Sequence, residues 1–309
     1  MRPGHRSAMT AEHRPLAAAL WMTGSIASFT AMAVAARQLN GVHDTFEIMT
    51  IRSLVGFLLV VSISAALGRL REVRVTRLPG HLARNIVHFA GQNLWLLAIG
   101  LIPLAQVFAI EFTSPIWVIV LSPFLLGEQI TRTRLIAAIM GFVGILIVAR
   151  PDFDSVNLGV LAAASCAICF ALTGITTKAL TRAESIISIL FWLTLMQFFM
   201  GGVLAAWDGQ ITLPTAQTLP WLLLIGFAGL LAHLCLTSAL RLAPASFVMP
   251  IDFARLPLIA VIGAVLYEES VDTFVILGAI LIVSGNLLNI RAEARKRDVK
   301  VTVPTAERI

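Results

Sequence analysis

Ten long apolar runs constrain the fold of this chain more than any other feature of its sequence. The connectors between them are short, and none is long enough to form a soluble domain. A helix needs about 20 apolar residues to cross the roughly 30 Å hydrocarbon core of a bilayer. The pattern therefore predicts an all-α polytopic membrane protein with ten transmembrane helices. The runs cover approximately residues 16–35, 45–67, 81–101, 104–126, 133–149, 158–177, 186–206, 220–240, 245–266 and 272–290.

The composition favours the same class. Of the 309 residues, 58% are hydrophobic and 13% are charged, and this charged share is about half of that in a soluble domain. Three cysteines do not make a disulfide framework. Cys166 and Cys169 form a CxxC motif inside an apolar run, with no second cysteine pair or histidine cluster, so we interpret them as packing residues. We expect no metal and no cofactor.

The lysines and arginines are distributed unevenly along the chain. Eighteen of them lie in the two terminal segments and in every second connector, whereas only Arg37 and Arg150 lie in the other connectors. Cytoplasmic connectors carry the excess of Lys and Arg, so we expect both termini to be cytoplasmic. The same asymmetry accounts for the net charge of +6 without a nucleic-acid partner, and it can attract anionic headgroups of the lipid bilayer.

An internal repeat divides the chain into two halves of five apolar runs each. We expect a cytoplasmic segment at 1–15, repeats at 16–150 and 151–290, and a basic cytoplasmic tail at 291–309. Because five is odd, the second repeat must enter the membrane from the opposite side, which is the inverted geometry of alternating-access transporters. At an offset of 141 residues the matched pairs are Pro103 and Pro244, Glu111 and Asp252, Glu128 and Glu269, Gly144 and Gly285, and Arg150 and Arg291.

The fourth and fifth runs of each repeat carry a local pattern, an acidic residue closing one helix followed by a glycine-rich helix. The two copies read FTSPIWVIVLSPFLLGEQITRTRLIAAIMGFVGILIV and ARLPLIAVIGAVLYEESVDTFVILGAILIVSGNLL. With its length and its two repeats, the chain resembles the EamA branch of the drug/metabolite transporter superfamily over about residues 16–290.

The resemblance implies a central cavity lined by the first four helices of each repeat. It implies that the fifth helices serve packing or the contacts of a homodimer, and that the protein resides in the cytoplasmic (inner) membrane of a bacterium as a multi-pass protein. Members of such families move amino acids, sugars, vitamins, nucleotide-like metabolites and drugs, so the motif indicates a small-molecule substrate without identifying it.

Four charged residues inside the apolar runs are the first candidates for a substrate site, because a charge in the bilayer is costly and usually faces the protein interior. Depth along straight helices predicts that Glu111 pairs with Arg52 in the outer half. Asp252 and Arg255, three residues apart, are expected to pair nearer the inner face, with Arg84 as another possible partner for Asp252. These pairs can bind substrate and a coupling ion such as a proton, or they can serve only to pin helices together.

Polar and aromatic residues in other runs complete the candidate site. Gln92 and Asn93 lie beside Trp95 in the third run, and His233 lies in the eighth, its counterpart in the second repeat. Their amide and imidazole groups can contact a ligand or join neighbouring helices. Trp95 and Trp117 are deep enough to stack on a flat ligand, although packing in the core is the favoured interpretation.

Prolines interrupt the same two runs that carry Glu111, Asp252 and Arg255. A proline removes a backbone donor, and the carbonyls it frees need partners, often at a cavity. We therefore expect the site around residues 108–117 and 249–257. The prolines concerned are Pro115, Pro123, Pro250 and Pro257.

Three classes of function are compared on these features. A secondary transporter is favoured by the inverted repeats, the interrupted helices and the sparse buried charges. A membrane enzyme would need a motif such as HExxH or GxSxG, and the sequence contains neither. A receptor or structural protein would be expected to have larger loops or tails. Within transport, uptake of a flat, flavin-like vitamin and efflux of amino-acid-like metabolites or drugs both stay open.

Overall fold

The computed structural model describes residues 14–39, 42–102, 104–149, 157–207, 211–267 and 273–302, and this part of the chain contains helices and no strand. The first half forms α1 (Pro15–Gln38), α2 (Thr45–Ala66), the 3-10 turn η1 (Leu70–Glu72), α3 (Leu78–Leu101), α4 (Leu104–Glu111), α5 (Ser114–Leu126) and α6 (Arg132–Ala149). The second half forms α7 (Leu158–Thr181), α8 (Ile186–Ala205), α9 (Leu219–Leu242), α10 (Ala245–Val248), the 3-10 segment η2 (Met249–Ala254), α11 (Arg255–Tyr267) and α12 (Thr273–Thr302).

Seven helical stretches in the described residues are long and apolar enough to cross a membrane, which confirms the all-helical, multi-pass class. The other expected crossings correspond to the polar α3, to α6 and to the interrupted stretch from α10 to α11. The number ten and the side that each end faces stay predictions. The seven stretches are 15–36, 45–66, 107–126, 158–181, 186–205, 219–242 and 273–295.

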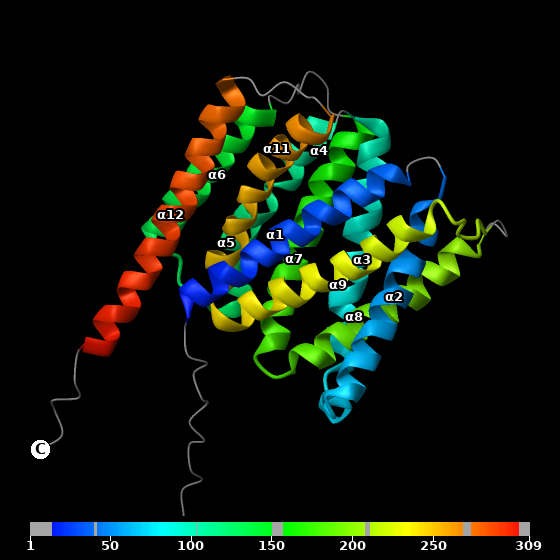
Figure 1. The fold of residues 1–309 in the computed structure, drawn as a ribbon. Coiled ribbons are helices and arrows are strands. Elements are labelled where there is room, and N and C mark those ends of the chain that lie inside the picture. The colour runs from blue at the N-terminus through cyan, green and yellow to red at the C-terminus, as the bar shows by residue number, and fades with distance from the viewer. Residues whose placement is uncertain are drawn as a thin grey trace, which may run out of the picture.

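The two halves pack against each other in a symmetric pattern (Figure 1). α1 packs along α9, and the counterpart pair α7 and α3 packs in the same way. α2 lies against its own counterpart α8 at one flank of the bundle, and α6 lies against its counterpart α12 at the other. Exchanging each helix for its counterpart in the other half therefore reproduces the main contacts.

Glycines allow the backbones of α6 and α12 to touch. A Cβ atom on Gly144 would lie 2.7 Å from the Gly278 carbonyl oxygen, and one on Gly278 would lie 2.6 Å from the Gly144 carbonyl oxygen. Both distances are too short for a side chain on either residue, because the neighbouring oxygen belongs to the backbone and cannot move aside. The glycines of the fifth and tenth expected helices thus serve close packing inside the chain.

Two of the expected spans are broken rather than continuous. The span expected at 104–126 divides into α4 and α5 directly after Glu111, where the Thr113 hydroxyl donates to the Ile110 carbonyl at 2.7 Å and Pro115 begins the next helix. The span expected at 245–266 is interrupted by the six residues of η2. Broken helices in a membrane need partners for their backbone groups.

Side chains from neighbouring helices supply these partners around η2. The Asn286 amide on α12 donates to the Ile251 carbonyl at 3.3 Å, and the Asn289 amide donates to the Phe247 carbonyl at 3.1 Å. Glu128, expected to be a cap or interface charge, accepts the backbone N–H groups of Ala245 and Ser246 at 2.8 and 3.0 Å and so caps α10. Its counterpart Glu269 lies outside the described residues.

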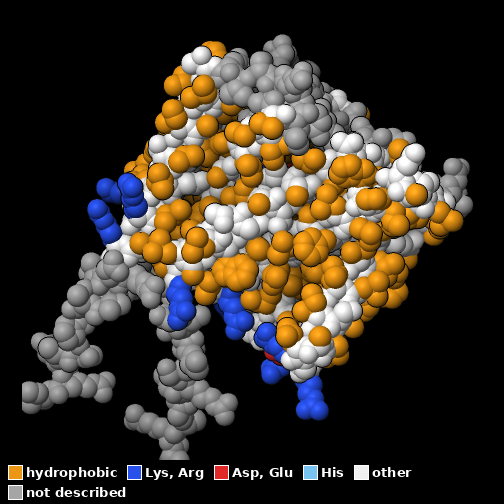
Figure 2. All heavy atoms as spheres, in the orientation of Figure 1, with side chains coloured by type: hydrophobic (Ala, Val, Ile, Leu, Met, Phe, Trp, Pro, Cys, Tyr) orange, Lys and Arg blue, Asp and Glu red, His pale blue; other side chains and the backbone are white. Residues whose placement is uncertain are grey.

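The surface has the charge distribution of a membrane protein. In Figure 2, the Lys and Arg side chains of the visible face gather along its lower edge, and hydrophobic side chains cover the area above them. Large apolar side chains are exposed on the surface in numbers that a soluble protein would bury, among them Phe124, Leu20 and Val203.

Candidate functional site

The helix breaks bring two carboxylates to one arginine in the interior of the bundle. Arg255, at the start of α11, donates from Nη2 to Glu111 Oε1 at 2.9 Å and to Asp252 Oδ2 at 3.0 Å. The indole Nε1 of Trp95, on α3, donates to the second Glu111 oxygen at 2.7 Å. We call Glu111, Asp252, Arg255 and Trp95 the carboxylate–arginine cluster.

Aromatic rings hold the guanidinium of this cluster from two sides. The Arg255 Cζ atom lies 4.9 Å from the centre of the Phe112 ring and 5.6 Å from that of Phe29 on α1. Cation–π contacts of this kind are strongest where water is excluded. Asp252 Oδ1 and Arg255 Nε remain buried without a hydrogen-bond partner. One hydrogen-bond acceptor and one hydrogen-bond donor of the cluster are thus unused. The two carboxylates share one guanidinium.

The expected pairing of Asp252 with Arg255 is confirmed, and the expected pairing of Glu111 with Arg52 is wrong. The prediction counted depth along straight helices. The chain instead turns directly after Glu111 and again through η2, so both carboxylates reach Arg255. The side of the membrane midplane on which each carboxylate lies stays a prediction.

A second group of polar side chains lies between α2, α3, α8 and α9. Arg84 is 2% exposed, and its guanidinium donates to the Thr177 hydroxyl at 3.2 Å and to the Asn85 side-chain oxygen at 3.1 Å. The suggested contact of Arg84 with Asp252 is therefore wrong. The rings of His88 on α3 and His233 on α9 meet edge to face, with centroids 4.9 Å apart.

Arg52 belongs to this second group. Arg52 and His233 line one small cavity, of about 20 Å³, together with Gln197 on α8. The Arg52 guanidinium passes closely over Gly229, where a Cβ atom would lie 2.7 Å from Arg52 Nε. Both arginines are electrostatic neighbours of both histidines. Arg84 and His88 do not line this cavity but lie next to residues that do, since the His88 ring contacts His233 and Arg84 is an electrostatic neighbour of Arg52. We call Arg52, Arg84, His88, His233 and Gln197 together the arginine–histidine pocket.

One face of α3 connects the two groups. Arg84, His88, Gln92 and Trp95 follow one another at intervals of four, four and three residues, which places them on one side of a helix. The Gln92 side-chain oxygen, between the two groups, is buried without a hydrogen-bond partner. We call these four residues the polar seam. Phe29 lies beside the seam, since its ring contacts Arg255 and also lies 5.5 Å from the His233 ring.

The remaining candidates lie apart from these contacts. The Asn93 amide donates to the Phe89 carbonyl of its own helix at 2.7 Å, which is a local bond rather than part of the seam. Trp117 is 39% exposed on the outer surface of α5. It does not lie in the cluster, because the turn after Glu111 directs this part of α5 outward.

Sequence reasoning missed His88, Asn85 and Gln197. The recoverable signal was the helical spacing of Arg84, His88 and Gln92 within one apolar run, which marks a polar face. Gln197 carried no such signal. Its amide donates to the Asn85 carbonyl at 3.0 Å, a contact between α8 and α3 that only the fold creates.

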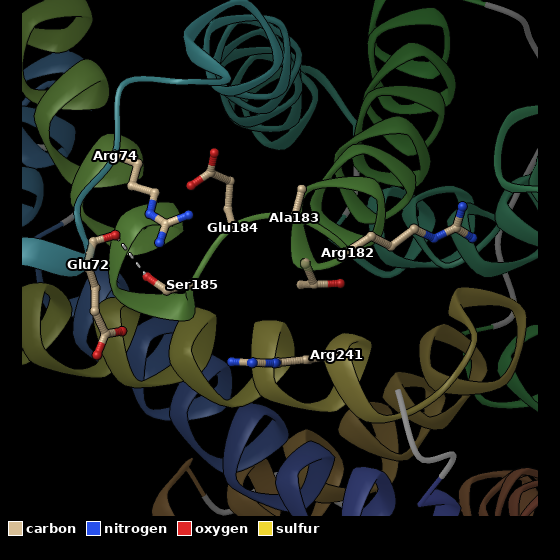
Figure 3. A pocket seen from close by; sticks show the side chains of 8 residues that line it. Glu72, Arg74, Arg182, Ala183, Glu184, Ser185 and Arg241 are labelled. Carbon is tan, nitrogen blue, oxygen red and sulfur yellow. Dashed lines mark hydrogen bonds between the residues drawn. The ribbon is translucent and has the colours of Figure 1, made fainter. Parts of the chain in front are cut away.

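A larger pocket, of about 360 Å³, opens at the end of the bundle near η1. Figure 3 shows Glu72 and Arg74 from the segment around η1, Glu184 and Ser185 from the turn before α8, and Arg241 from α9 around it. The Ser185 hydroxyl donates to the Glu72 carbonyl oxygen at 3.3 Å. This end pocket carries charges of both signs on loops, which is typical of a solvated vestibule.

Its carboxylate Glu72 also forms an exposed ion pair. Arg69 donates to Glu72 from Nη2 at 3.1 Å, and this hydrogen bond lowers the pKa of the Glu72 carboxyl below its usual value. Glu72 is therefore ionised at neutral pH.

Comparison with known proteins agrees with the two-repeat arrangement. The model of the EamA-like transporter family matches residues 16–150 and again residues 157–291. A riboflavin transporter of Vibrio cholerae serotype O1 is 30% identical over 282 residues, covering 89% of this chain and 93% of its own. A second riboflavin transporter, from Rhizobium johnstonii, is 31% identical over 216 residues, covering 70% and 71%.

Two further similarities extend over most of the chain. An S-adenosylmethionine uptake transporter of Rickettsia bellii is 26% identical over 281 residues, covering 91% of this chain and 96% of its own. A solved crystal structure covers 90% of this chain and 98% of its own with a TM-score of 0.78 and 17% identity, which shows a shared fold. These relatives are transporters rather than enzymes. The chain belongs to the EamA-like transporter family.

Proposed function

We propose that this protein is a secondary transporter that moves a small organic metabolite across the cytoplasmic membrane of a bacterium by alternating access. In this proposal the chain crosses the membrane ten times, as two inverted repeats with both termini in the cytoplasm. The symmetric packing of α1 with α9 and of α3 with α7 supports this, as does the gathering of Lys and Arg at one edge of Figure 2.

The polar seam is the observation that carries the proposal. It is a line of polar side chains through an apolar bundle, it joins two charged groups, and it contains buried polar atoms without partners. Unsatisfied buried groups are rare in proteins and each needs an explanation. A solute passing between the repeats would supply the missing partners, and the broken helices beside the seam are where transporters of inverted-repeat design hold their substrates.

The carboxylate–arginine cluster is suited to coupling with protons. Two carboxylates face one guanidinium, so a formal charge of −1 remains when all three are ionised. A proton or a cationic group would neutralise it, and its arrival would weaken the hold of Arg255 on one of the two acids. We therefore assign the cluster to binding of a proton or another cation during the transport cycle.

The relatives favour uptake of a flat solute. Two of them are named as riboflavin transporters and one as an S-adenosylmethionine uptake transporter. Trp95 and Phe29 stand at the seam and could stack on such a ring. Efflux of amino-acid-like metabolites or drugs is the second candidate within transport, supported by the ion pairs that a zwitterion could enter.

Metabolite profiling of cells and medium tests the proposal. Cells would express the intact chain, Asp252→Asn, Arg255→Gln, or the control Glu72→Gln, whose exposed ion pair lies in the end pocket. We expect one compound to cross the membrane with the intact chain and the control, and flux to be abolished in the other two at equal protein levels in the membrane. Full flux in both cluster variants would contradict the site, and no flux of any compound with the intact chain would contradict the transporter proposal.

A further inference from the structure

The arginine–histidine pocket differs from an ordinary buried polar group in its charge. It contains two guanidinium groups, and in the part of the chain that the structure describes neither Arg52 nor Arg84 has a carboxylate within ion-pair distance. The contacts of Arg84 are to neutral groups, a threonine hydroxyl and an asparagine amide. Buried charges are normally paired, because an uncompensated one is costly in an apolar interior.

The other side chains of the pocket also lack partners. All four ring nitrogens of His88 and His233 are buried without a hydrogen bond, and so is the side-chain oxygen of Gln197. Each neutral imidazole has one N–H to donate, and each guanidinium has several. These groups come from four helices of both repeats, and Gly229 has no side chain that would keep Arg52 out. The pocket is therefore rich in donors, and no carboxylate among the described residues accepts from them.

We propose that the arginine–histidine pocket binds an anionic group, a phosphate or a carboxylate, of the transported solute. This inference rests on the proposed transport function and deepens it by naming the chemical class of the substrate. An oxyanion would accept hydrogen bonds from both guanidinium groups and from the imidazoles, and the forked geometry of arginine matches such groups. The carboxylate–arginine cluster, which also contacts Phe29, would face the cationic or ring portion of the same solute.

A metal ion does not fit the same pocket. Two imidazoles could ligate a transition metal, but the described residues contain no group of three or more His, Cys, Asp or Glu side chains able to hold one. Two adjacent guanidinium groups would also repel a cation. The electrostatics therefore select an anion.

The free space of about 20 Å³ accommodates about one water molecule and no larger group. An anion can bind only after a side chain moves aside. Arg52 is the side chain best able to do so, since it makes no hydrogen bond in the described residues and is positioned by packing over Gly229. Anion binding would therefore begin with a movement of the Arg52 side chain away from Gly229.

Binding of inorganic phosphate tests the proposal directly. The purified full chain would be placed in phosphatidylcholine nanodiscs and titrated with phosphate, acetate or tetramethylammonium at constant ionic strength, followed by calorimetry and thermal unfolding. We expect phosphate to bind and raise the unfolding temperature, and Arg52→Gln and Arg84→Gln each to weaken binding about tenfold or more. Arg241→Gln, in the end pocket, is the matched control and should leave the affinity within about twofold.

Several results of this titration would overturn the proposal. Phosphate affinity that is unchanged in both pocket variants, or lowered as much by Arg241→Gln, would overturn the proposal, as would preference for tetramethylammonium. Repeating the titration with phosphatidylglycerol in the nanodiscs distinguishes the source of the anion. Competition by this lipid would assign the pocket to a headgroup and overturn its assignment to a solute.

A second variant keeps the test decisive if one of the two variants does not fold. If Arg84→Gln does not yield folded protein, Arg52→Gln carries the test, because Arg52 makes no hydrogen bond that its loss would leave open. Phosphate binding is read without flux, so its failure leaves the transport proposal intact. Intact phosphate binding without any flux would instead contradict the proposed function and leave the pocket in place.

Discussion

The carboxylate–arginine cluster and the arginine–histidine pocket both contact the ring of Phe29 and solve the problem of buried charge in opposite ways. In the cluster, Arg255 is held by Glu111 and Asp252 at 2.9 and 3.0 Å, with Trp95 as a further donor. In the pocket, two arginines face histidines and amides. The charge of Arg255 is balanced by two carboxylates of the same chain, whereas the proposed counter-charge of Arg52 and Arg84 is an anionic group of the solute. Only the arginine–histidine pocket should therefore bind an added anion strongly.

Removing one arginine from each site should give the largest difference between them. Arg255→Gln leaves two buried carboxylates without their cation, and breaking such a pair typically costs about 3–5 kcal/mol of folding free energy. Arg52→Gln removes a charge that has no partner, so the free energy of unfolding should stay equal or rise. Thermal unfolding in nanodiscs without phosphate measures both.

A rescue experiment sharpens this expectation. Adding Glu111→Gln to Arg255→Gln removes one of the two stranded carboxylates and should restore part of the lost stability. Equal destabilisation by Arg52→Gln and Arg255→Gln would show that the two sites do not differ in compensation, and the comparison would fail.

A matched pair of tryptophans should give the next largest effect. Trp95→Phe removes the donor to Glu111 Oε2, and hydrogen bonds to charged groups contribute about 1.5–3 kcal/mol. Trp117→Phe changes a partly exposed side chain on the outer surface, where substitutions usually alter stability by less than about 0.5 kcal/mol. Thermal unfolding and transport, measured for both variants, distinguish a contact in the carboxylate–arginine cluster from one on the lipid-facing surface. A larger loss of flux in Trp117→Phe than in Trp95→Phe would assign Trp117 to the substrate site and contradict this comparison.

Gly229→Ala should give the smallest effect, confined to the pocket. The new methyl group would meet Arg52 Nε and displace the guanidinium, which is the end of a flexible side chain, without removing its charge. We expect phosphate affinity to fall by about 1 kcal/mol, roughly fivefold. Gly202→Ala is the control, because its nearest neighbour, Thr50 Cγ2, would lie at an ordinary 3.8 Å. Calorimetry that gives equal affinities for the two variants would contradict the placement of Arg52.

Much of the fold could be predicted because hydrophobic length and repetition are local properties of a sequence. The apolar runs at 16–35 and 45–67 coincide closely with α1 and α2. A capping box of Asp44 and Glu47 marks the start of α2. The 141-residue offset agrees with the two segments that match the family model. Pro115 and Pro250 lie at the two helix breaks, as expected, whereas Pro123 and Pro257 lie inside α5 and α11.

The site was less predictable because it depends on angles rather than on positions along the chain. Depth counting paired Glu111 with Arg52 rather than with Arg255, since it assumed straight helices. The turn after Glu111 and the tighter winding of η2 changed the direction of both side chains. His88 was overlooked because its importance comes from His233, which is distant in sequence and lies 4.9 Å away by ring centroid.

The single ring of Phe29 has a consequence for the size of the cargo. It touches the guanidinium of one site at 5.6 Å and the imidazole of the other at 5.5 Å, so the sites are separated by little more than the thickness and width of a phenyl group. A solute too short to span this ring would contact one site at a time. A longer one, with an anionic group at one end and a cationic group at the other, would contact both sites in one orientation only. On the proposed function, Phe29 would therefore favour cargo of a minimum length and fix its orientation.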